Sequence, residues 1–371
     1  MPETPRKSPA LPIRRPTIPL LGIVLQSFAL RVYRLDAQPL RGDEAFSMVN
    51  WLNSLAYTFG TLATVDPQPP GALLSLYGWV QLVGRTEFAV RYLSVLAGVM
   101  SIAAIYGMGH LLKGSRAGLL AALLWAVNPY QIWFAQDLRN AALWVGFSSV
   151  STWLMLSAIR SPRRPALWIL YVVTAALGLY TFYLEFFVLA AHNLFMLSRS
   201  LRSRGLLQRW IAAQAGLGLL LAPWFWQPRL YLSGYKPTAG PVNIPWAVQA
   251  LVFGETLPAP WQQPPFHLHQ VGPASSAALG LIGLSLVLIW SQNKKRSALF
   301  VSLYALLPMT LLSALTAVTG EGYFHPRYLL SSAPSFVLIL GLGLDTLADG
   351  SLIGKVERAL AGVLLLGIVG L

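Results

Sequence analysis

The residues of this sequence that are best suited to chemistry lie in short segments, far apart along the chain. Five acidic residues stand beside polar or aromatic neighbours: Asp43, Glu44, Asp66, Asp137 and Glu185. Three arginines occur in or near the same segments: Arg91, Arg139 and Arg327. Carboxylates can remove a proton from an acceptor hydroxyl, and guanidinium groups bind phosphate through two parallel hydrogen bonds. The question is whether the fold brings these groups together.

Asp43 precedes a stretch with the periodicity of a helix that lies on a membrane surface. Apolar residues recur there every three or four positions: Phe46, Val49, Leu52, Ala56 and Phe59. This spacing predicts a surface-lying helix with Asp43 on its polar face. Glu44 lies about 100° further round the axis, so the two acids cannot share one role. The alternative is that Asp43 merely caps the helix.

The other polar segments also have simpler explanations. Asp66 stands just before prolines that suit a helix start, so it can be a helix cap. Glu87 and Arg91 are four residues apart and can form a local ion pair. His267 and His269 would point opposite ways on a strand and have no third ligand nearby, which makes them a poor metal site. No cofactor is certain, and a divalent cation remains possible.

Composition identifies the class of protein. Of the 371 residues, 55% are apolar and only 11% are charged, against about 25% charged in an average soluble domain. With a mean hydropathy of +0.57, most of the chain must lie in lipid. The net charge of +14 would suit nucleic acid, but in a membrane protein it indicates positive cytoplasmic loops, so we expect no nucleic-acid partner. The absence of cysteine excludes thiolate nucleophiles and disulfides.

We predict an all-α, polytopic membrane protein with about eleven transmembrane helices. Residues 1–16 form a basic cytoplasmic tail, predicted to be disordered, and residues 17–371 form one transmembrane domain. The apolar runs long enough for spans lie at about 17–35, 88–112, 117–134, 140–159, 166–181, 184–198, 206–226, 274–291, 298–318, 327–344 and 356–371. The chain ends at the end of an apolar run, a position from which a further outer domain could continue in a longer protein.

The predicted topology depends on whether one short apolar stretch, residues 71–83, spans the membrane. The distribution of basic residues decides this question. If it lies at the interface, two helices separate each basic cluster from the next, and every cluster falls in the cytoplasm, as the positive-inside rule requires. The inner face then holds 18 basic and 4 acidic residues, and the outer face nine of each. We therefore predict a cytoplasmic N-terminus, an outer C-terminus and two long outer loops, about 36–87 and 227–273.

This topology places the candidate residues at one depth. All five acids and all three arginines fall near the outer boundary of the membrane. Ionisable groups there are costly unless they are paired or functional. The clustering therefore predicts a site at the outer face.

The ordered motifs resemble those of a known superfamily. In sequence they are Gly-Asp-Glu at 42–44, Asp-x-Gln-Pro-Pro at 66–70, Glu-Phe-Ala-Val-Arg-Tyr-Leu-Ser at 87–94, Phe-Ala-Gln-Asp-Leu-Arg at 134–139, Gly-Leu-Tyr-Thr-x-Tyr at 178–183 and Pro-Arg-Tyr-Leu-Leu at 326–330. The chain resembles GT-C membrane glycosyltransferases of the protein O-mannosyltransferase and aminoarabinose-transferase type. The resemblance covers essentially the whole chain and also implies surface-lying helices in the first outer loop.

The resemblance also implies roles for individual residues. Asp43 matches the presumed base, Glu44 its supporting or metal-organising neighbour, and Asp66 and Asp137 the acids of the later motifs. Basic positions near the lipid phosphate match Arg91, Arg139 and Arg327, and further substrate-binding candidates are Tyr328, Gln68 and Glu185. The sequence departs from the pattern at Gln68, where the family often has His or Lys, and at Asn140-Ala141, where Met-Tyr is more usual.

The function implied is transfer of a sugar from a polyprenyl-phosphate carrier to an acceptor hydroxyl, with inversion. The acceptor can be a lipid, a glycan or a protein, and the expected location is the plasma (inner) membrane with the active site on the outer face. The main alternative is a transporter or flippase of lipid-linked sugars, which would place polar groups and broken helices at the midplane. A structural subunit with a degenerate site is a third reading.

Overall fold

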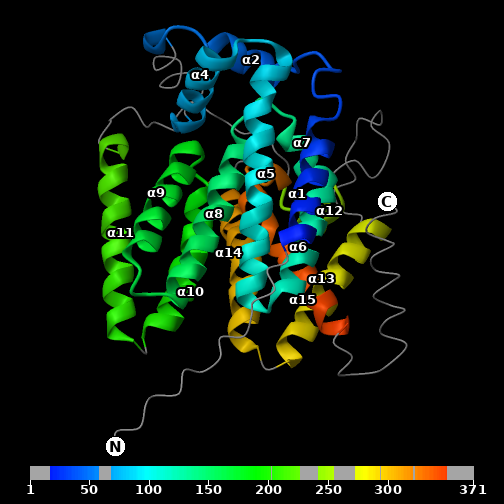
Figure 1. Ribbon diagram of the computed structural model, residues 1–371, viewed down its shortest axis with the longest axis vertical. Helices are drawn as coiled ribbons and strands as arrows, with labels where there is room; N and C mark the ends of the chain where they lie inside the picture. Colours follow the sequence, from blue (N-terminus) through cyan, green and yellow to red (C-terminus); the bar gives the residue numbers. More distant parts are fainter. Residues whose placement is uncertain are drawn as a thin grey trace, which may run out of the picture.

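The computed structural model describes residues 17–57, 68–201, 203–225, 241–254, 272–292, 294–320 and 322–348. Within these ranges the protein is helical and contains no β-strand, which confirms the predicted all-α class. The long helices form a bundle, and the short helices α2 and α4 lie together across one end of it (Figure 1). We call this end the α2 end. The prediction for Asp66, the pair of His267 and His269 and the run 356–371 all lie outside the described residues.

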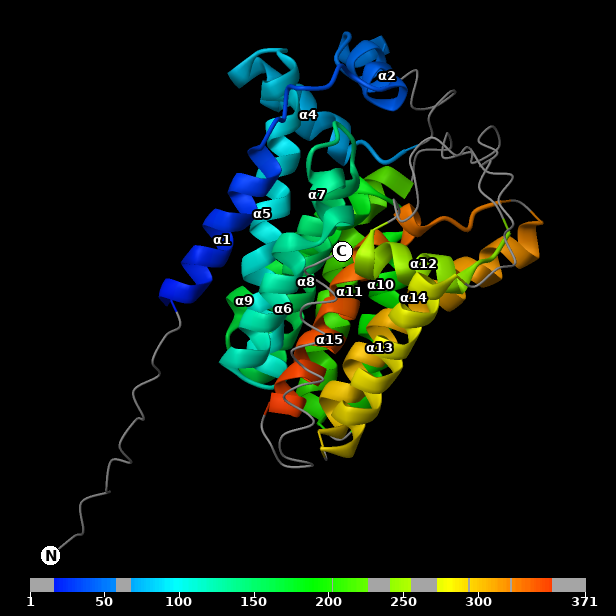
Figure 2. The same cartoon turned by 90° about the vertical axis from the view of Figure 1, so that its right-hand side faces the viewer.

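Most of the predicted apolar runs are helices with nearly the predicted bounds. Those running along the bundle are α1 (Thr17–Val32), α5 (Glu87–Leu112), α8 (Ala141–Arg160), α9 (Pro165–Thr181), α10 (Glu185–Ser200), α11 (Arg204–Phe225), α13 (Pro273–Ser291), α14 (Lys295–Thr319) and α15 (Ala333–Ala348). The remaining elements are α2 (Gly42–Trp51), α4 (Gly71–Val83), α6 (Ser115–Val127), α7 (Pro129–Ala135), α12 (Ile244–Phe253) and the 3₁₀ helix η1 (Pro326–Ser332). α1 lies at the edge of the bundle (Figure 2).

Fewer helices than the eleven predicted spans are both long and apolar enough to cross a membrane. Among the described residues, five helices are long and apolar enough to cross a membrane, or six if α6 and α7 form one bent span. Several shorter apolar helices fall below that length, α1, α4, α9 and α12 among them. The polytopic class is therefore confirmed, and the count of eleven remains a prediction. The α4 helix has the bounds predicted for the interfacial piece, and its thirteen residues reach only about 20 Å.

One predicted span is broken where its sequence reads Asn128-Pro129. α6 and α7 meet at an angle of 61°. Asn128 caps α7 by accepting a hydrogen bond from the Gln131 N–H at 3.0 Å, and the proline takes the first helical position, where no donor is lost. The Asn128 amide also donates to the carbonyls of Leu251 and Val252, at 3.0 and 3.2 Å, and so ties the break to the end of α12.

A buried arginine of α1 holds the other side of the break. The Arg31 side chain is fully buried and donates to the Ala126 carbonyl at 3.0 Å and to the Ser27 hydroxyl at 2.6 Å. The Gln136 amide in turn donates to the carbonyls of Arg31 and Tyr33. The Arg31 bond satisfies a carbonyl at the end of α6, and the Gln136 bonds satisfy carbonyls at the end of α1, which lack helical partners. They also fix the direction in which α7 leads the chain towards Asp137.

Polar as well as apolar side chains of α2 face the bundle. The buried side chains of α2 are Glu44, Ser47 and Trp51, and of the predicted apolar stripe Leu52 is buried while Val49 is 64% exposed. An exposed apolar side chain suits a helix on a membrane surface, so that orientation remains a prediction. Hydrogen bonds made by Glu44, described below, hold α2 on the bundle. The capping interpretation of Asp43 is also not supported, because the helix starts at Gly42, and the acid that accepts from the N-cap backbone is Glu44.

Three basic segments meet at the end of the bundle away from α2. Lys113, after α5, pairs with Asp345 of α15 at 2.8 Å. The Ser297 hydroxyl at the start of α14 donates to the Leu112 carbonyl at 2.8 Å, and Arg160 at the end of α8 donates to the Leu111 carbonyl. Three of the clusters predicted to share the cytoplasmic face therefore lie at one end of the bundle, in agreement with the predicted topology.

Candidate active site

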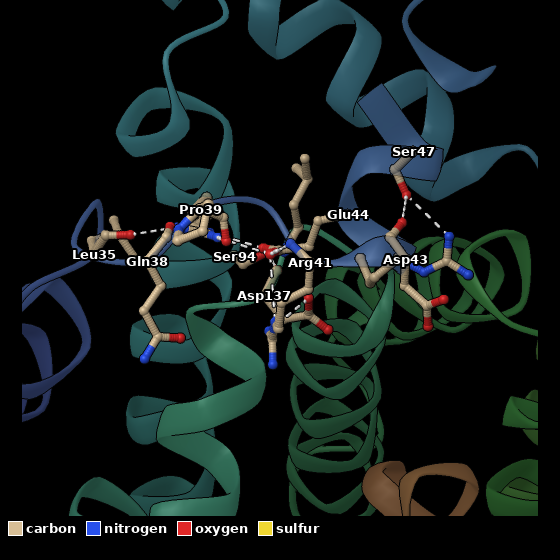
Figure 3. A network of polar contacts seen from close by, with 12 residues as sticks. Leu35, Gln38, Pro39, Arg41, Asp43, Glu44, Ser47, Ser94 and Asp137 are labelled. Carbon is tan, nitrogen blue, oxygen red and sulfur yellow. Dashed lines mark hydrogen bonds and ion pairs between the residues drawn. The ribbon is translucent and has the colours of Figure 1, made fainter. Parts of the chain in front are cut away.

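Glu44 is the centre of a hydrogen-bond network at the α2 end (Figure 3). Its carboxylate is fully buried and accepts two bonds from the Arg91 guanidinium, both at 2.8 Å. It also accepts from the backbone N–H groups of Leu138 and Arg41, each at 3.0 Å. Burial alone would raise the pKa of Glu44, but the bonds from Arg91 and from the two backbone groups outweigh it and lower the pKa to about 2. Glu44 is therefore a fixed anion with both oxygens occupied.

Arg91 is fully engaged in the same network. Besides its two bonds to Glu44, the guanidinium donates to the carbonyls of Leu35 and Gln38 at 2.9 Å and of Pro39 at 3.2 Å. All five of its N–H donors are thus used. Arg91 fastens the first outer loop to α5 and has no donor left for a phosphate.

Asp137 follows α7 and lies against the same network. Its backbone carbonyl accepts from the Ser94 hydroxyl at 2.7 Å, and its carboxylate pairs with Arg41 at 3.1 Å. Arg41 in turn lies over the Trp133 ring, 4.2 Å from its centroid. Burial raises the pKa of Asp137 to about 6 despite the attraction of Arg41. Asp137 can therefore change its protonation state near neutral pH.

Asp43 has the opposite environment from its neighbour Glu44. Its side chain is exposed, and among the described residues its carboxylate has no hydrogen-bond or ion-pair partner, while its carbonyl accepts from the Ser47 hydroxyl at 3.0 Å. In Figure 3 the Asp43 carboxylate is directed towards the helical bundle. It is close enough to Asp137 for the negative charge of Asp43 to contribute to the raised pKa of Asp137. Two carboxylates from segments 94 residues apart thus lie near one another.

Arg139 brings a cation to the same side of α2. It donates to the Ser47 hydroxyl at 3.0 Å, and its guanidinium lies 5.1 Å from the centroid of the Trp51 ring. Stacking on a ring restrains a guanidinium without using its N–H donors. Arg139 is therefore held in place by contacts that leave the guanidinium suited to a further anion.

The two positions that depart from the family pattern touch each other. The Asn140 amide donates to Gln68 Oε1 at 2.9 Å, and it lies 3.4 Å from the Thr181 carbonyl. Gly71, at the start of α4, permits this arrangement, because a Cβ there would lie 2.5 Å from the Tyr180 carbonyl oxygen. The segment carrying Gln68 is thus packed closely on the end of α9.

Glu185, Tyr328 and Arg327 belong to a second group, joined through aromatic rings. Glu185 is fully buried and accepts from the Trp144 indole at 2.7 Å. The Trp144 ring contacts Phe182 edge-on, and Phe182 stacks on Tyr328, with centroids 4.8 and 6.0 Å apart. Arg327 donates to the Tyr328 hydroxyl at 3.0 Å and lies over its ring. The rings connect α8, the start of α10 and η1.

The structure therefore brings together half of the ten residues expected in the site. Asp43, Glu44, Arg91, Asp137 and Arg139 form one cluster at the α2 end. In the part of the chain that is described, no group of three or more acidic or histidine residues is arranged to hold a metal ion.

Sequence reasoning missed two members of this cluster. Arg41 stands three residues before Glu44 and could have been recognised as part of the Arg-Gly-Asp-Glu segment. Ser94 ends the motif at 87–94, but a single serine in a helix carries no signal of the bond it makes to Asp137.

Comparison with known proteins agrees with this architecture. Residues 67–226 match the family described as dolichyl-phosphate-mannose-protein mannosyltransferase. No curated protein matches the sequence.

Among solved structures, ArnT from Cupriavidus metallidurans bound to undecaprenyl phosphate aligns with a TM-score of 0.65 at 16% identity, over 95% of this chain and 70% of ArnT. The oligosaccharyltransferase AglB from Archaeoglobus fulgidus, in complex with an inhibitory peptide and a dolichol-phosphate, aligns with a TM-score of 0.56 at 11% identity, over 94% of this chain and 54% of AglB. The chain has the GT-C fold of membrane glycosyltransferases, and the resemblance carried by its ordered motifs is confirmed.

Proposed function

We propose that this protein transfers a sugar from a polyprenyl-phosphate carrier to an acceptor hydroxyl at the outer face of the plasma membrane. The matching family is described by a lipid-phosphate sugar donor, and the two solved relatives hold undecaprenyl phosphate and dolichol-phosphate. Each buried CH₂ of a lipid tail contributes about 0.8 kcal/mol, so a polyprenyl chain stays in the bilayer. An enzyme for such a donor needs its reacting groups at the membrane boundary, and the cluster lies at one end of the bundle.

The observation that carries the proposal is the contrast between Asp43 and Glu44. Glu44 accepts five hydrogen bonds and cannot accept a proton without losing part of the network. Asp43 is held on the same rigid turn but keeps an exposed carboxylate, directed towards the bundle. A general base must reach its proton without first breaking another bond. We assign the role of base to Asp43 and a positioning role to Glu44 and Arg91.

The reaction is a single displacement with inversion. The acceptor hydroxyl gives its proton to Asp43, and its oxygen forms a bond to the anomeric carbon. The bond between that carbon and the phosphate oxygen breaks, and polyprenyl phosphate leaves with the electron pair. Arg139, restrained by Ser47 and Trp51, is the cation we assign to the departing phosphate, with Arg327 on the η1 side.

The test compares two aspartates of the first outer loop in proteoliposomes. Asp43→Asn removes the proposed base, and Asp36→Asn is the matched control, because Asp36 is also exposed but lies outside the cluster. Labelled polyprenyl-phosphate sugars are supplied in turn, with an envelope extract as acceptor source, and release of polyprenyl phosphate is measured. General-base catalysis contributes about 10² to 10⁴ in rate, so Asp43→Asn should lose at least 10²-fold while Asp36→Asn stays within about twofold. Similar rates for the two variants would remove Asp43 as base.

One observation favours the alternative of a transporter for lipid-linked sugars. Transporters often contain broken helices, and the pair α6 and α7 is bent by 61°. However, the break is tied on both sides by Asn128 and Arg31, and α7 leads directly to Asp137. The same assay separates the two functions. A transporter would move the labelled lipid between leaflets without releasing polyprenyl phosphate.

A further inference from the structure

A basic cavity lies at the end of the bundle away from α2, where the ends of α5 and α8 meet the start of α14. Its volume is about 670 Å³. Six of its lining residues are basic or histidine: His110, Lys113, Arg160, Lys294, Lys295 and Arg296. Among the described residues, no carboxylate lines it. None of these residues belongs to the cluster around Glu44.

Hydrogen bonds between helix ends give this cavity a fixed shape. Arg160 donates from the end of α8 to the carbonyl of Leu111, which closes one wall against α5. The Ser297 hydroxyl donates from the first turn of α14 to the Leu112 carbonyl at 2.8 Å, which closes the other. The cavity is therefore formed by three helix ends fastened to one another, and its cations are carried on those ends.

Within the described part of the chain, most of the positive charge around the cavity has no acid paired with it. Lys113 is the exception, because it pairs with Asp345 at 2.8 Å, and that carboxylate also lies 3.7 Å from Arg116. The side chains of Arg160 and of residues 294–296 are exposed at the rim. A sphere of 670 Å³ is about 11 Å across. The charges around the cavity are therefore separated by a distance close to the Debye length, about 8 Å at physiological salt, so salt screens their repulsion only in part. These cations therefore repel one another unless an anion binds between them.

The location indicates what the anion is. Leu111 is twenty residues from Arg91 along α5, which corresponds to about 30 Å, the thickness of the hydrocarbon core of a bilayer. The cavity thus lies at the opposite membrane boundary from the candidate active site. Leu111 and Leu112 add apolar surface to its lining. Cations beside apolar side chains at a membrane boundary match a phosphate head group and the first atoms of its acyl chains.

We propose that this cavity binds the head-group phosphate of an anionic phospholipid from the inner leaflet. The lipid would neutralise the cations on α8 and α14 and hold the ends of α5, α8 and α14 together. This binding is independent of the sugar-transfer reaction, and its loss would leave the contacts of Asp43 and Glu44 unchanged.

The test measures lipid binding by the full-length protein in a neutral detergent. Dioleoyl-phosphatidylglycerol, dioleoyl-phosphatidylcholine and inorganic phosphate are titrated separately, and the midpoint of thermal unfolding and the mass of bound lipid are recorded. The variant K294Q/K295Q/R296Q removes three cations from the cavity. The control R163Q/R164Q/R209Q removes three exposed arginines from the same predicted face that do not line the cavity.

We expect phosphatidylglycerol to raise the unfolding midpoint of the wild type and of the control, and phosphatidylcholine to have no such effect. The cavity variant should bind phosphatidylglycerol at least tenfold more weakly. The proposal is overturned if the control loses as much affinity as the cavity variant, or if inorganic phosphate stabilises the wild type as well as the lipid does. If the triple variant does not fold, Lys295→Gln alone should weaken binding about threefold, and unchanged binding would overturn the proposal.

Discussion

Replacing Glu44 by glutamine tests whether this buried carboxylate positions the site. Oε1 of Glu44 accepts from Arg91 Nε and Leu138 N–H, and Oε2 accepts from Arg91 Nη2, Arg41 N–H and, at 3.5 Å, Arg41 Nε. Glutamine keeps one oxygen and places an NH₂ group where the other stood. At least two N–H donors would then face the new NH₂ group, and the Arg91 charge, only 3% exposed, would lose its counterion.

The expected cost follows from breaking a buried ion pair. Removing one partner of such a pair destabilises a protein by about 3–5 kcal/mol, because the other charge stays buried without compensation. Arg91 keeps three backbone carbonyls, so we expect the lower part of this range, about 3 kcal/mol for Glu44→Gln. The measurement is equilibrium unfolding in mixed micelles of a mild detergent and dodecyl sulfate.

Asp43→Asn is the matched control, because it makes the same chemical change one residue away on an exposed side chain. Its effect on the free energy of unfolding should stay within about 0.5 kcal/mol. The two variants should therefore separate cleanly: Glu44→Gln loses stability and activity, whereas Asp43→Asn loses activity alone. Equal stability of the two variants would refute the assignment of Glu44 as the residue that positions the first outer loop.

Two further predictions concern residues near the same cluster. Burial raises the pKa of Asp137 to about 6, so its ion pair with Arg41 should be intact above that pH and should weaken as the pH falls through 6. Turnover should accordingly fall on the acid side with an inflection near pH 6, and Asp137→Asn should abolish that inflection; an unchanged profile in the variant would contradict the role of the pair. Asn128 both caps α7 and donates to the carbonyls at the end of α12. Asn128→Ser keeps a neutral capping oxygen but removes the amide donors, whereas Asn128→Ala removes both. Unfolding measurements should therefore show Asn128→Ala destabilised by about 1 kcal/mol more than Asn128→Ser, the usual contribution of a cap, and equal losses would show that the cap contributes nothing.

The helices were predictable from the sequence because their signals are local. An apolar run of sufficient length, ended by Gly, Pro or a charged residue, is enough to give α4, α5, α8 and α9 within a few residues. α12 was not predicted, since its ten residues lie inside a loop rich in Pro and Trp and are too few for a periodic signal. Asn243 and Pro245 do mark its start, as an N-cap and an early helical proline.

The roles within the site were less predictable, because they depend on contacts between distant segments. Asp43 and Glu44 are adjacent and chemically alike, and periodicity says only that they point in different directions. Which of them is buried depends on Arg91, 47 residues away, and on the Leu138 N–H, 94 residues away. The same bonds hold the side of α2 that carries Glu44 and Ser47 against the bundle, with Val49 exposed.

The contact between Gln68 and Asn140 gives a physical meaning to the two departures from the family pattern. Taken separately, Gln68 is a lost cation and Asn140 an unexplained polar residue. In the structure the Asn140 amide donates to Gln68 Oε1 at 2.9 Å, so each supplies a partner that the other needs. A lysine at 68 would meet the amide donor of Asn140, and a methionine at 140 would offer Gln68 no hydrogen at all. The two changes are therefore a matched pair rather than independent losses. They place a neutral amide pair, rather than the cation that the family pattern would put at 68, beside the end of α9.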